Sequence, residues 1–266
     1  MIDYDYQHPR SSLSITLSVW YALLLREAVT RLSSSRAAWV WLILEPLAHV
    51  CFMLFIFTVI RMRTVSGIDT AAWLMVGLIF YFLFKRTGTQ TQNALSANKA
   101  LFGYRQVKPV DTILVRAILE GLLLVVVGTV LVFGSLLFQV DIVPDDPLIV
   151  LVAFFGLWFM GLGYGLMTSV LITLIPVSSK ILGMVMRPVY MTSGAILPIS
   201  HVPEPFRGWL LYNPIAHGLE AARSGMSSYY HTVPGLDIGY LYFCALSSIF
   251  FGLALHKRYA MKLVAR

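Results

Sequence analysis

The sequence predicts an all-α membrane protein with six transmembrane helices, an N-terminal amphipathic interface helix, and short re-entrant half-helices between spans five and six. Apolar residues make up 58% of the 266 residues and charged residues 12%, whereas soluble domains average about 45–50% and about 25%. Long uncharged runs recur along the chain, and Lys and Arg gather in short tracts between them. So much apolar surface requires lipid or neighbouring helices around it.

Residues 1–36 form an N-terminal segment that we place in the cytoplasm, and residues 13–33 within it are predicted to be an amphipathic helix. Apolar side chains recur at helical spacing on one side, namely Leu13, Leu17, Trp20, Leu24 and Ala28. Charged and hydroxyl side chains occupy the other side, namely Arg26, Glu27, Thr30 and Arg31. The helix carries too many charges to span a bilayer, so we expect it to lie in the membrane interface. An ordinary soluble packing helix is the alternative.

Residues 37–266 form the transmembrane domain. The first span, 37–60, contains one charge, and the second, 70–84, ends at Lys85 and Arg86. The other spans are expected at 121–140, 146–176, 181–199 and 238–255. Thirty-three uncharged residues separate Asp146 from Lys180. They would form about 50 Å of helix, which exceeds a hydrocarbon core of roughly 30 Å and implies a tilted fourth span.

The distribution of basic residues predicts the orientation. Alternate connecting segments, together with both termini, hold 16 of the 20 Lys and Arg residues. Basic segments stay in the cytoplasm, so both termini are expected there. The net charge of +7 is therefore interpreted as attraction to membrane lipids and not as nucleic-acid binding. Arg61 and Arg63 fall on the outer side, against this rule.

The outer region between spans five and six, residues 200–236, contains the stretch YNPIAHGLEAAR. In it Asn213 is a suitable helix N-cap, and Pro214 suits the first helical position. The helix that follows is too short to cross a bilayer. We therefore expect re-entrant half-helices, whose irregular connections must be buried in protein or line a cavity.

Three ionisable residues of this stretch, His217, Glu220 and Arg223, are spaced three apart. They form either a reactive face or a structural set in which Glu220 pairs with Arg223. We favour the structural interpretation because no second cluster supplies a nucleophile or a third metal ligand, and the two-histidine zinc pattern is absent. No catalytic residue and no metal site are predicted.

Two stretches resemble a known family. SGAILPISHVPEPFRGWLLYNPIAHGLEAAR (193–223) and WVWLILEP (39–46) are similar to sequences in permease subunits of type 2 ABC exporters, in the capsule and O-antigen polysaccharide export branch. The resemblance covers essentially the whole chain. It implies a homodimer in the bacterial inner membrane that engages two copies of a separate ATPase and exports a polysaccharide or glycolipid. It also implies an export partner in the periplasm or outer membrane.

The chain itself offers no nucleotide-binding loop. It lacks the motif G-x-x-x-x-G-K-[ST], in which a glycine-rich loop cradles the phosphates. We therefore expect a translocation subunit without enzyme activity and without its own cofactor. ATP and Mg²⁺ are expected on the partner subunit.

The polar cytoplasmic segment 87–112 resembles the coupling loop of this family. We predict that a helix over 98–106 contacts the ATPase, with Leu101, Phe102 and Tyr104 entering a groove on it. Asn98 is expected to cap this helix, with Lys99 and Arg105 at the rim. The alternative is a connecting helix on the membrane surface.

An exported polysaccharide needs aromatic rings and hydrogen-bonding groups along its path. The candidates within spans are Trp73, Tyr81, Trp158, Tyr164 and Tyr190; each is alternatively an interfacial anchor or a packing residue. Arg61 and Arg63 are candidates for binding an acidic sugar or the phosphate of a lipid-linked glycan. Snorkelling toward lipid head groups is the alternative for both arginines.

A charged residue within a predicted span also indicates a functional or paired position. Glu45 is the ionisable group of span one, and Arg187, at the base of span five, is its candidate partner. The glycines of GLWFMGLGYG (156–165) allow either close helix contact or space for a polymer.

Other functions remain as alternatives. A drug, lipid or teichoic-acid exporter permease belongs to the same superfamily. A membrane-embedded lipid-linked sugar transferase would need clustered Asp, Glu or His on one membrane face, and an ion channel would need rings of charge or of carbonyl groups. The acidic residues of this chain are dispersed instead.

Overall fold

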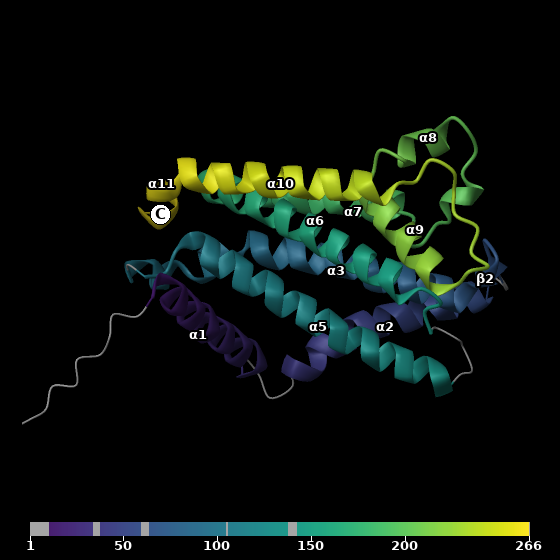
Figure 1. The fold of residues 1–266 in the computed structure, drawn as a ribbon, viewed down its shortest axis with the longest axis horizontal. Coiled ribbons are helices and arrows are strands. Elements are labelled where there is room, and N and C mark those ends of the chain that lie inside the picture. The colour runs from purple at the N-terminus through teal and green to yellow at the C-terminus, as the bar shows by residue number, and fades with distance from the viewer. Residues whose placement is uncertain (1–10, 34–37, 60–63, 105, 138–142, 266) are drawn as a thin grey trace, which may run out of the picture.

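The structure is a computed structural model that describes residues 11–33, 38–59, 64–104, 106–137 and 143–265. From α2 onward the long helices run back and forth along the molecule (Figure 1). They are α1 (Ser12–Ser33), α2 (Ala38–Val59), α3 (Thr70–Gln92), α5 (Pro109–Leu137), α6 (Pro147–Leu174), α7 (Ser178–Thr192) and α10 (Ile238–Arg258). The fold is that of an all-α membrane protein, with one small exception: strands β1 (Thr64–Val65) and β2 (Ile68–Asp69) form a hairpin before α3.

Short elements gather at the two ends of the bundle (Figure 1). One end, called here the α9 end, carries the hairpin, η2 (Ile199–His201), α8 (Phe206–Leu210) and α9 (Pro214–Met226). The other, called the α11 end, carries α4 (Ala94–Ala97), η1 (Lys99–Gly103) and α11 (Ala260–Ala265).

Length and composition identify the helices that are able to cross a membrane. In the described part of the chain, five such segments lie within α1, α3, α5, α6 and α10, and a shorter apolar stretch, Leu44–Phe57, lies within α2. Helix α7 has 15 residues, about 22 Å of helix, and a hydrocarbon core is roughly 30 Å thick. The chain is thus a multi-pass helical protein, and the count of six spans stays a prediction.

Two helices extend beyond their expected ends. Helix α3 continues past Lys85 and Arg86 to Gln92, and α5 begins at Pro109 instead of residue 121. Charges near these ends are neutralised between the helices, as where Arg86 Nε lies 3.2 Å from Glu120 Oε2. The helices therefore need no solvent-exposed loop at these charges, and the connection between them is residues 93–108, shorter than the predicted segment 87–112.

Helices α3, α6 and α10 form the centre, where glycines allow close approach. A Cβ atom added at Gly165 would lie 1.7 Å from Thr91 Oγ1 on α3, and one at Gly163 would lie 2.7 Å from Ser248 Cβ on α10. Of the two roles that we considered for the glycine run 156–165, the structure therefore shows close helix contact.

Helix α1 buries Glu27 against the protein, while Arg26 and Thr30 are exposed. Glu27 is buried against α5, whereas Leu13, Leu17 and Val29 are 59–74% exposed. The predicted sides are only partly reproduced: Trp20, Leu24 and Ala28 of the predicted apolar side are half-buried, and Arg26 and Thr30 of the predicted polar side are exposed. Because Leu13–Arg31 is also long and apolar enough to cross a membrane, the placement of α1 in the interface stays a prediction.

Helix α9 is a short helix packed inside the protein. Its 13 residues form about 20 Å of helix, too short to cross a bilayer. Nine of the 13 are buried, and a Cβ added at Gly218 would lie 2.6 Å from Leu157 Cγ on α6. Before it, α7 ends at Thr192 and the chain turns at Gly194, whose φ of +76° favours glycine. Span five therefore ends earlier than predicted.

Candidate functional site

The start of α9 is held by local hydrogen bonds. Asn213 Oδ1 accepts from the Ile215 N–H at 3.1 Å, with Pro214 in the first turn, so the predicted cap is confirmed. The His217 ring is held at both nitrogens: Nε2 lies 2.7 Å from Leu211 O, and Nδ1 accepts from the Asp237 N–H at 2.9 Å. His217 therefore joins the two flanking segments of α9 to the helix.

Further along α9, four side chains form what we call the Arg223 cluster, namely Trp73, Glu220, Arg223 and Tyr230. Arg223 is 0% exposed. Its Nη1 donates to Glu220 Oε1 at 2.9 Å, its Nη2 donates to Gly194 O at 2.9 Å, and its Nε donates to Trp73 O at 3.3 Å. The predicted pair of Glu220 with Arg223 is therefore present, and it is a buried one.

The remaining members of the Arg223 cluster complete its pairing. The guanidinium carbon of Arg223 lies 3.8 Å from the centre of the Trp73 ring, a cation–π geometry. The Tyr230 hydroxyl donates to Glu220 Oε2 at 2.7 Å. Burial, and then the neighbouring Glu220 carboxylate, raise the pKa of Tyr230, so its hydroxyl stays protonated and able to donate. The Arg223 charge is paired on all these sides, so its role is structural: it holds α3, α9 and the turn after α7 together.

The structure separates the five aromatic residues predicted for a substrate path. Trp73 belongs to the buried Arg223 cluster, and Trp158 donates through Nε1 to Ala117 O at 2.7 Å, against α5. Tyr81 and Tyr190 are adjacent, with ring centres 4.5 Å apart. Phe84 links Tyr81 to Tyr164, at 6.3 Å and 6.1 Å. We call this group, Tyr81, Phe84, Tyr164 and Tyr190, the aromatic chain.

Within the aromatic chain, exposure distinguishes the members. Tyr81 is 0% exposed, like Trp73, so neither ring faces an open surface in this conformation, and the structure corrects the prediction that they line a path. Close packing of α3 against its neighbours covers both rings. Tyr190 and Tyr164 are half-buried.

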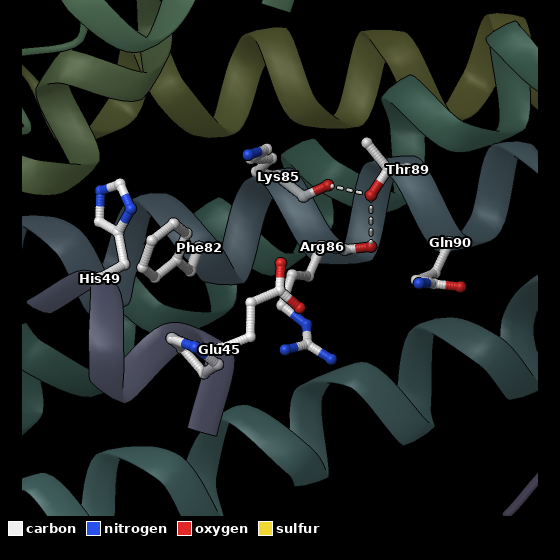
Figure 2. Close-up of a pocket in the computed structure, with 8 residues that line it drawn as sticks. Glu45, His49, Phe82, Lys85, Arg86, Thr89 and Gln90 are labelled. Atoms are coloured by element: carbon white, nitrogen blue, oxygen red, sulfur yellow. Dashed lines mark hydrogen bonds between the residues drawn. The ribbon is translucent and has the colours of Figure 1, made fainter. Parts of the chain in front are cut away.

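A cleft of about 260 Å³ lies beside the aromatic chain, between α2 and α3 (Figure 2). We call it the α2–α3 cleft; its lining residues are Glu45, Pro46, His49, Phe82, Lys85, Arg86, Thr89 and Gln90. His49 Nε2 lies 2.8 Å from the Tyr190 hydroxyl, which connects the cleft to the aromatic chain. Glu45 and Lys85 are both exposed.

The partner predicted for Glu45 is wrong. Among the described residues no ion pair joins Glu45 to Arg187, which is exposed on α7. Glu45 instead shares its cleft with Lys85 and Arg86. The sequence predicts that the two basic residues mark the end of a span, because it cannot show that α3 continues past them beside α2. Arg61 and Arg63 lie outside the described residues.

A second set of charges lies between α1, α3 and α5. We call it the α1–α5 charge network, and it comprises Glu27, Arg31, Arg86, Arg116 and Glu120. Arg31 Nε and Arg116 Nε lie 3.0 and 2.8 Å from Glu27 Oε1. Glu120 pairs with Arg31 and with Arg86, and its side chain is 0% exposed. Sequence reasoning missed this network because Arg31 and Glu120 are 89 residues apart.

The segment predicted to contact an ATPase is partly buried. Phe102 is 7% exposed and packs in a cluster with Leu95, Ile113 and Leu263, so it does not project outward as predicted. Asn98 is also buried: its Nδ2 donates to Ala94 O at 2.9 Å and its Oδ1 accepts from Arg26, so it does not cap the next helix. The predicted helix is replaced by the two short elements α4 and η1.

The exposed part of this segment is smaller than predicted. Lys99 is exposed, Leu101 is half-buried and Tyr104 is 67% exposed, while Arg105 lies outside the described residues. Helix α1 contacts this segment where Arg26 donates to Asn98 Oδ1, and it contacts the start of α5 where Trp20 Nε1 donates to Asp111 Oδ1 at 2.9 Å. A surface of Lys99, Leu101 and Tyr104 therefore remains for a partner. In the described part of the chain, no group of three or more His, Cys, Asp and Glu side chains is placed to hold a metal ion.

Comparison with known proteins gives consistent results along the chain. The profile of a family described as ABC-2 type transporter matches residues 18–227. The chain is 33% identical over 248 residues to the polysialic acid transport protein KpsM of Escherichia coli, covering 93% of this chain and 96% of the relative. It is 28% identical over 257 residues to the capsule polysaccharide export inner-membrane protein BexB of Haemophilus influenzae, with 94% of each chain covered. It is 27% identical over 252 residues to the capsule polysaccharide export inner-membrane protein CtrC of Neisseria meningitidis serogroup A, again with 94% of each covered.

Proposed function

The chain belongs to the ABC-2 type transporter family, and we propose that it is the transmembrane subunit of an ATP-driven exporter. It moves a lipid-linked, capsular-type polysaccharide across the bacterial inner membrane. The observation that carries this proposal is the end-to-end similarity, over 93% of this chain, to relatives named for polysialic acid transport and capsule polysaccharide export. The multi-pass helical fold supports it, because such a fold supplies a conduit through lipid.

ATP is hydrolysed by a separate subunit in this proposal, and ATP and Mg²⁺ bind there. The sequence contains no phosphate-binding loop of the type that an ATPase requires. The surface of Lys99, Leu101 and Tyr104 at the α11 end is the contact with that subunit. Its contact with α1, through Arg26 and Asn98, makes it suited to transmit movement into the helices.

Two copies of the chain form the exporter in this proposal. Helix α7 supports it: of its 15 residues, Ser178 alone is buried, while Ile181, Met184 and Met191 are 56–68% exposed. The same helix carries Lys180 and Arg187, both exposed. A charged helix of this kind is poorly suited to lipid, and a second protomer would cover it.

The α11 end faces the cytoplasm and the α9 end faces the periplasm in this proposal. The tail that leads into and forms α11 contains Lys257, Arg258 and Lys262, which fits the preference of basic segments for the cytoplasmic side. Both termini then lie in the cytoplasm. An envelope-spanning export partner meets the α9 end.

The polymer passes along the α2 and α7 side of the protomer. Support comes from Tyr190 and the α2–α3 cleft, which place an aromatic ring and polar side chains next to each other on this side. Rings that stack and groups that form hydrogen bonds are what a sugar chain requires.

Co-purification with the ATPase subunit encoded in the same organism tests the proposal. We expect the wild-type chain to bring down the ATPase, and Tyr104→Ala to weaken this binding about tenfold, because exposed tyrosines at interface centres carry much of the binding energy. Tyr229→Ala is the matched control, because Tyr229 is 76% exposed but lies in the segment after α9.

Deleting the chain tests the transported substance. We expect glycan to accumulate inside the cell and to reach the surface again when the wild-type chain is restored. ATP hydrolysis by the purified chain alone, or a deletion that leaves surface glycan unchanged, contradicts the proposal.

A further inference from the structure

We propose that the α2–α3 cleft binds an anionic group, a carboxylate or a phosphate, carried by the exported molecule. The inference rests on the proposed function and specifies the chemistry of its substrate.

Groups able to bind an anion line one small space. Lys85 and Arg86 are adjacent on α3 and both line the cleft; the Arg86 side chain points toward Glu45, and the Lys85 side chain points away from it (Figure 2). Gln90 Oε1 accepts from Arg31 Nη2 at 3.4 Å, and its amide nitrogen is turned toward the Arg86 side of the cleft (Figure 2). A volume of about 260 Å³ is smaller than a typical pocket for a drug-sized ligand and suits a single charged group or sugar unit.

Arg86 is held in place from behind. Its Nε lies 3.2 Å from Glu120 Oε2, and Glu120 is completely buried in the α1–α5 charge network. This contact fixes the position of the guanidinium group, so Arg86 contributes a positive charge to the wall of the cleft from a constant place.

Lys85 differs from Arg86 because its charge has no carboxylate partner. Among the described residues no ion pair includes Lys85, and its Nζ lies 6.0 Å from the centre of the Phe82 ring. The residue is exposed and lies within a helix that is apolar enough to cross a membrane. A charge in that position is costly unless it faces water or a counter-ion, and such residues mark ligand pathways.

The neighbourhood of the cleft suits a sugar. His49 and Phe82 pack edge to face, with ring centres 5.2 Å apart, and His49 reaches the Tyr190 hydroxyl at 2.8 Å. An anionic sugar held by Lys85 would therefore lie beside aromatic rings. Glu45, in the same cleft, competes with the bound anion and keeps its affinity low enough for release, as a transport site requires.

Binding of a defined acidic glycan tests the site. The complex with its ATPase is placed in phosphatidylcholine nanodiscs, and the probes are oligosialic acid and an uncharged maltose oligomer of the same length. We expect oligosialic acid to bind and the neutral oligomer to bind far more weakly. Lys85→Gln should lower the affinity for oligosialic acid about tenfold, as loss of a charge-assisted contact does, and Glu45→Gln should raise it. Lys257→Gln is the matched control, since Lys257 is an exposed lysine at the far end of α10.

A second arm distinguishes the source of the anion. Phosphatidylglycerol is added to the nanodiscs, and its retention by the wild-type complex and by Lys85→Gln is compared. Lys85-dependent binding of oligosialic acid supports the site, and Lys85-dependent retention of the lipid in addition shows that the site also accepts a phosphate. Lys85-dependent retention of the lipid without binding of oligosialic acid identifies a site for membrane lipid and overturns the proposal. Equal loss in Lys85→Gln and Lys257→Gln, or no loss of either probe, overturns it.

Failure of this inference is distinguishable from failure of the proposed function. Restoration of surface glycan by the wild-type chain in a deletion strain tests the function and does not depend on Lys85. A strain in which Lys85→Gln restores export fully contradicts the anion site and leaves the exporter proposal intact.

Discussion

Two charged regions of this protein lie on opposite sides of α3 and differ in how their charges are satisfied. In the Arg223 cluster, Arg223 is 0% exposed and is paired with Glu220, two backbone carbonyls and the Trp73 ring. In the α2–α3 cleft, Glu45 and Lys85 are exposed. A charge neutralised on every side contributes to architecture, whereas an exposed charge on an apolar helix retains the capacity to bind something else.

The α1–α5 charge network is largely buried, like the Arg223 cluster, and it shares one residue with the α2–α3 cleft. Arg86 belongs both to the network and to the cleft, because one edge of its guanidinium group faces Glu120 while the residue lines the cleft. The structural network therefore positions a residue of the proposed binding site. This arrangement is typical of functional sites, which need buried supporting contacts behind the groups that touch the ligand.

The largest effect is expected for Arg223→Met. The change leaves Glu220 buried without its partner, which costs about 3–5 kcal/mol. The measurement is the thermal unfolding of the detergent-purified protein. Arg258→Met is the control: Arg258 is exposed and forms no ion pair among the described residues, so the loss should be about 0.5 kcal/mol or less. A fully stable Arg223→Met protein would show that burial of this charge is not architectural.

A smaller effect is expected for Glu120→Ala. The change removes the acceptor shared by Arg31 and Arg86 and should cost about 2–3 kcal/mol. Helix α1 should also become more sensitive to protease, which limited digestion of the solubilised protein would measure. Glu204→Ala should change neither property, because the Glu204 side chain, which pairs with Arg207, is 65% exposed. If α1 stays as resistant to protease in Glu120→Ala as in the wild type, the α1–α5 charge network does not hold that helix in place.

The smallest effect on stability is expected for a substitution that involves no charge and tests only how closely two helices pack. Gly165→Ala should destabilise the protein by about 1–3 kcal/mol through overpacking against α3, because the added Cβ would meet Thr91 Oγ1 at 1.7 Å. Gly128→Ala is the same substitution in a helix where nothing lies within 4 Å of the added atom. It should be neutral or slightly stabilising. Equal melting temperatures for the two variants would mean that the α3–α6 contact tolerates separation.

Local signals in the sequence predicted individual elements well. The Asn213–Pro214 start of α9 and the pairing of Glu220 with Arg223 follow from spacing within one helix, and both are present. The sequence predicts a docking helix in which Phe102 enters a groove on the partner and Asn98 is the cap, yet both side chains are buried. Spacing within a short segment does not reveal which side a neighbouring helix will cover.

The partner of Glu45 illustrates a different limit. An ionisable residue within a span is readily recognised, but its neighbours come from a helix some 40 positions further along the chain, at Lys85 and Arg86. The α1–α5 charge network was invisible for the same reason, since its ion pairs join residues that are far apart in sequence. Such pairs depend on the registration of two helices, which no local pattern encodes.

Composition alone determined that this chain is a multi-pass helical membrane protein, because 58% apolar residues exceed what a soluble protein of this length can bury. Periodicity and capping residues determined where most helices lie. Only the tertiary structure decided which charges are buried in pairs and which remain exposed in a cleft. The reason is physical: the cost of a charge depends on what surrounds it, and those surroundings are assembled from distant segments by packing.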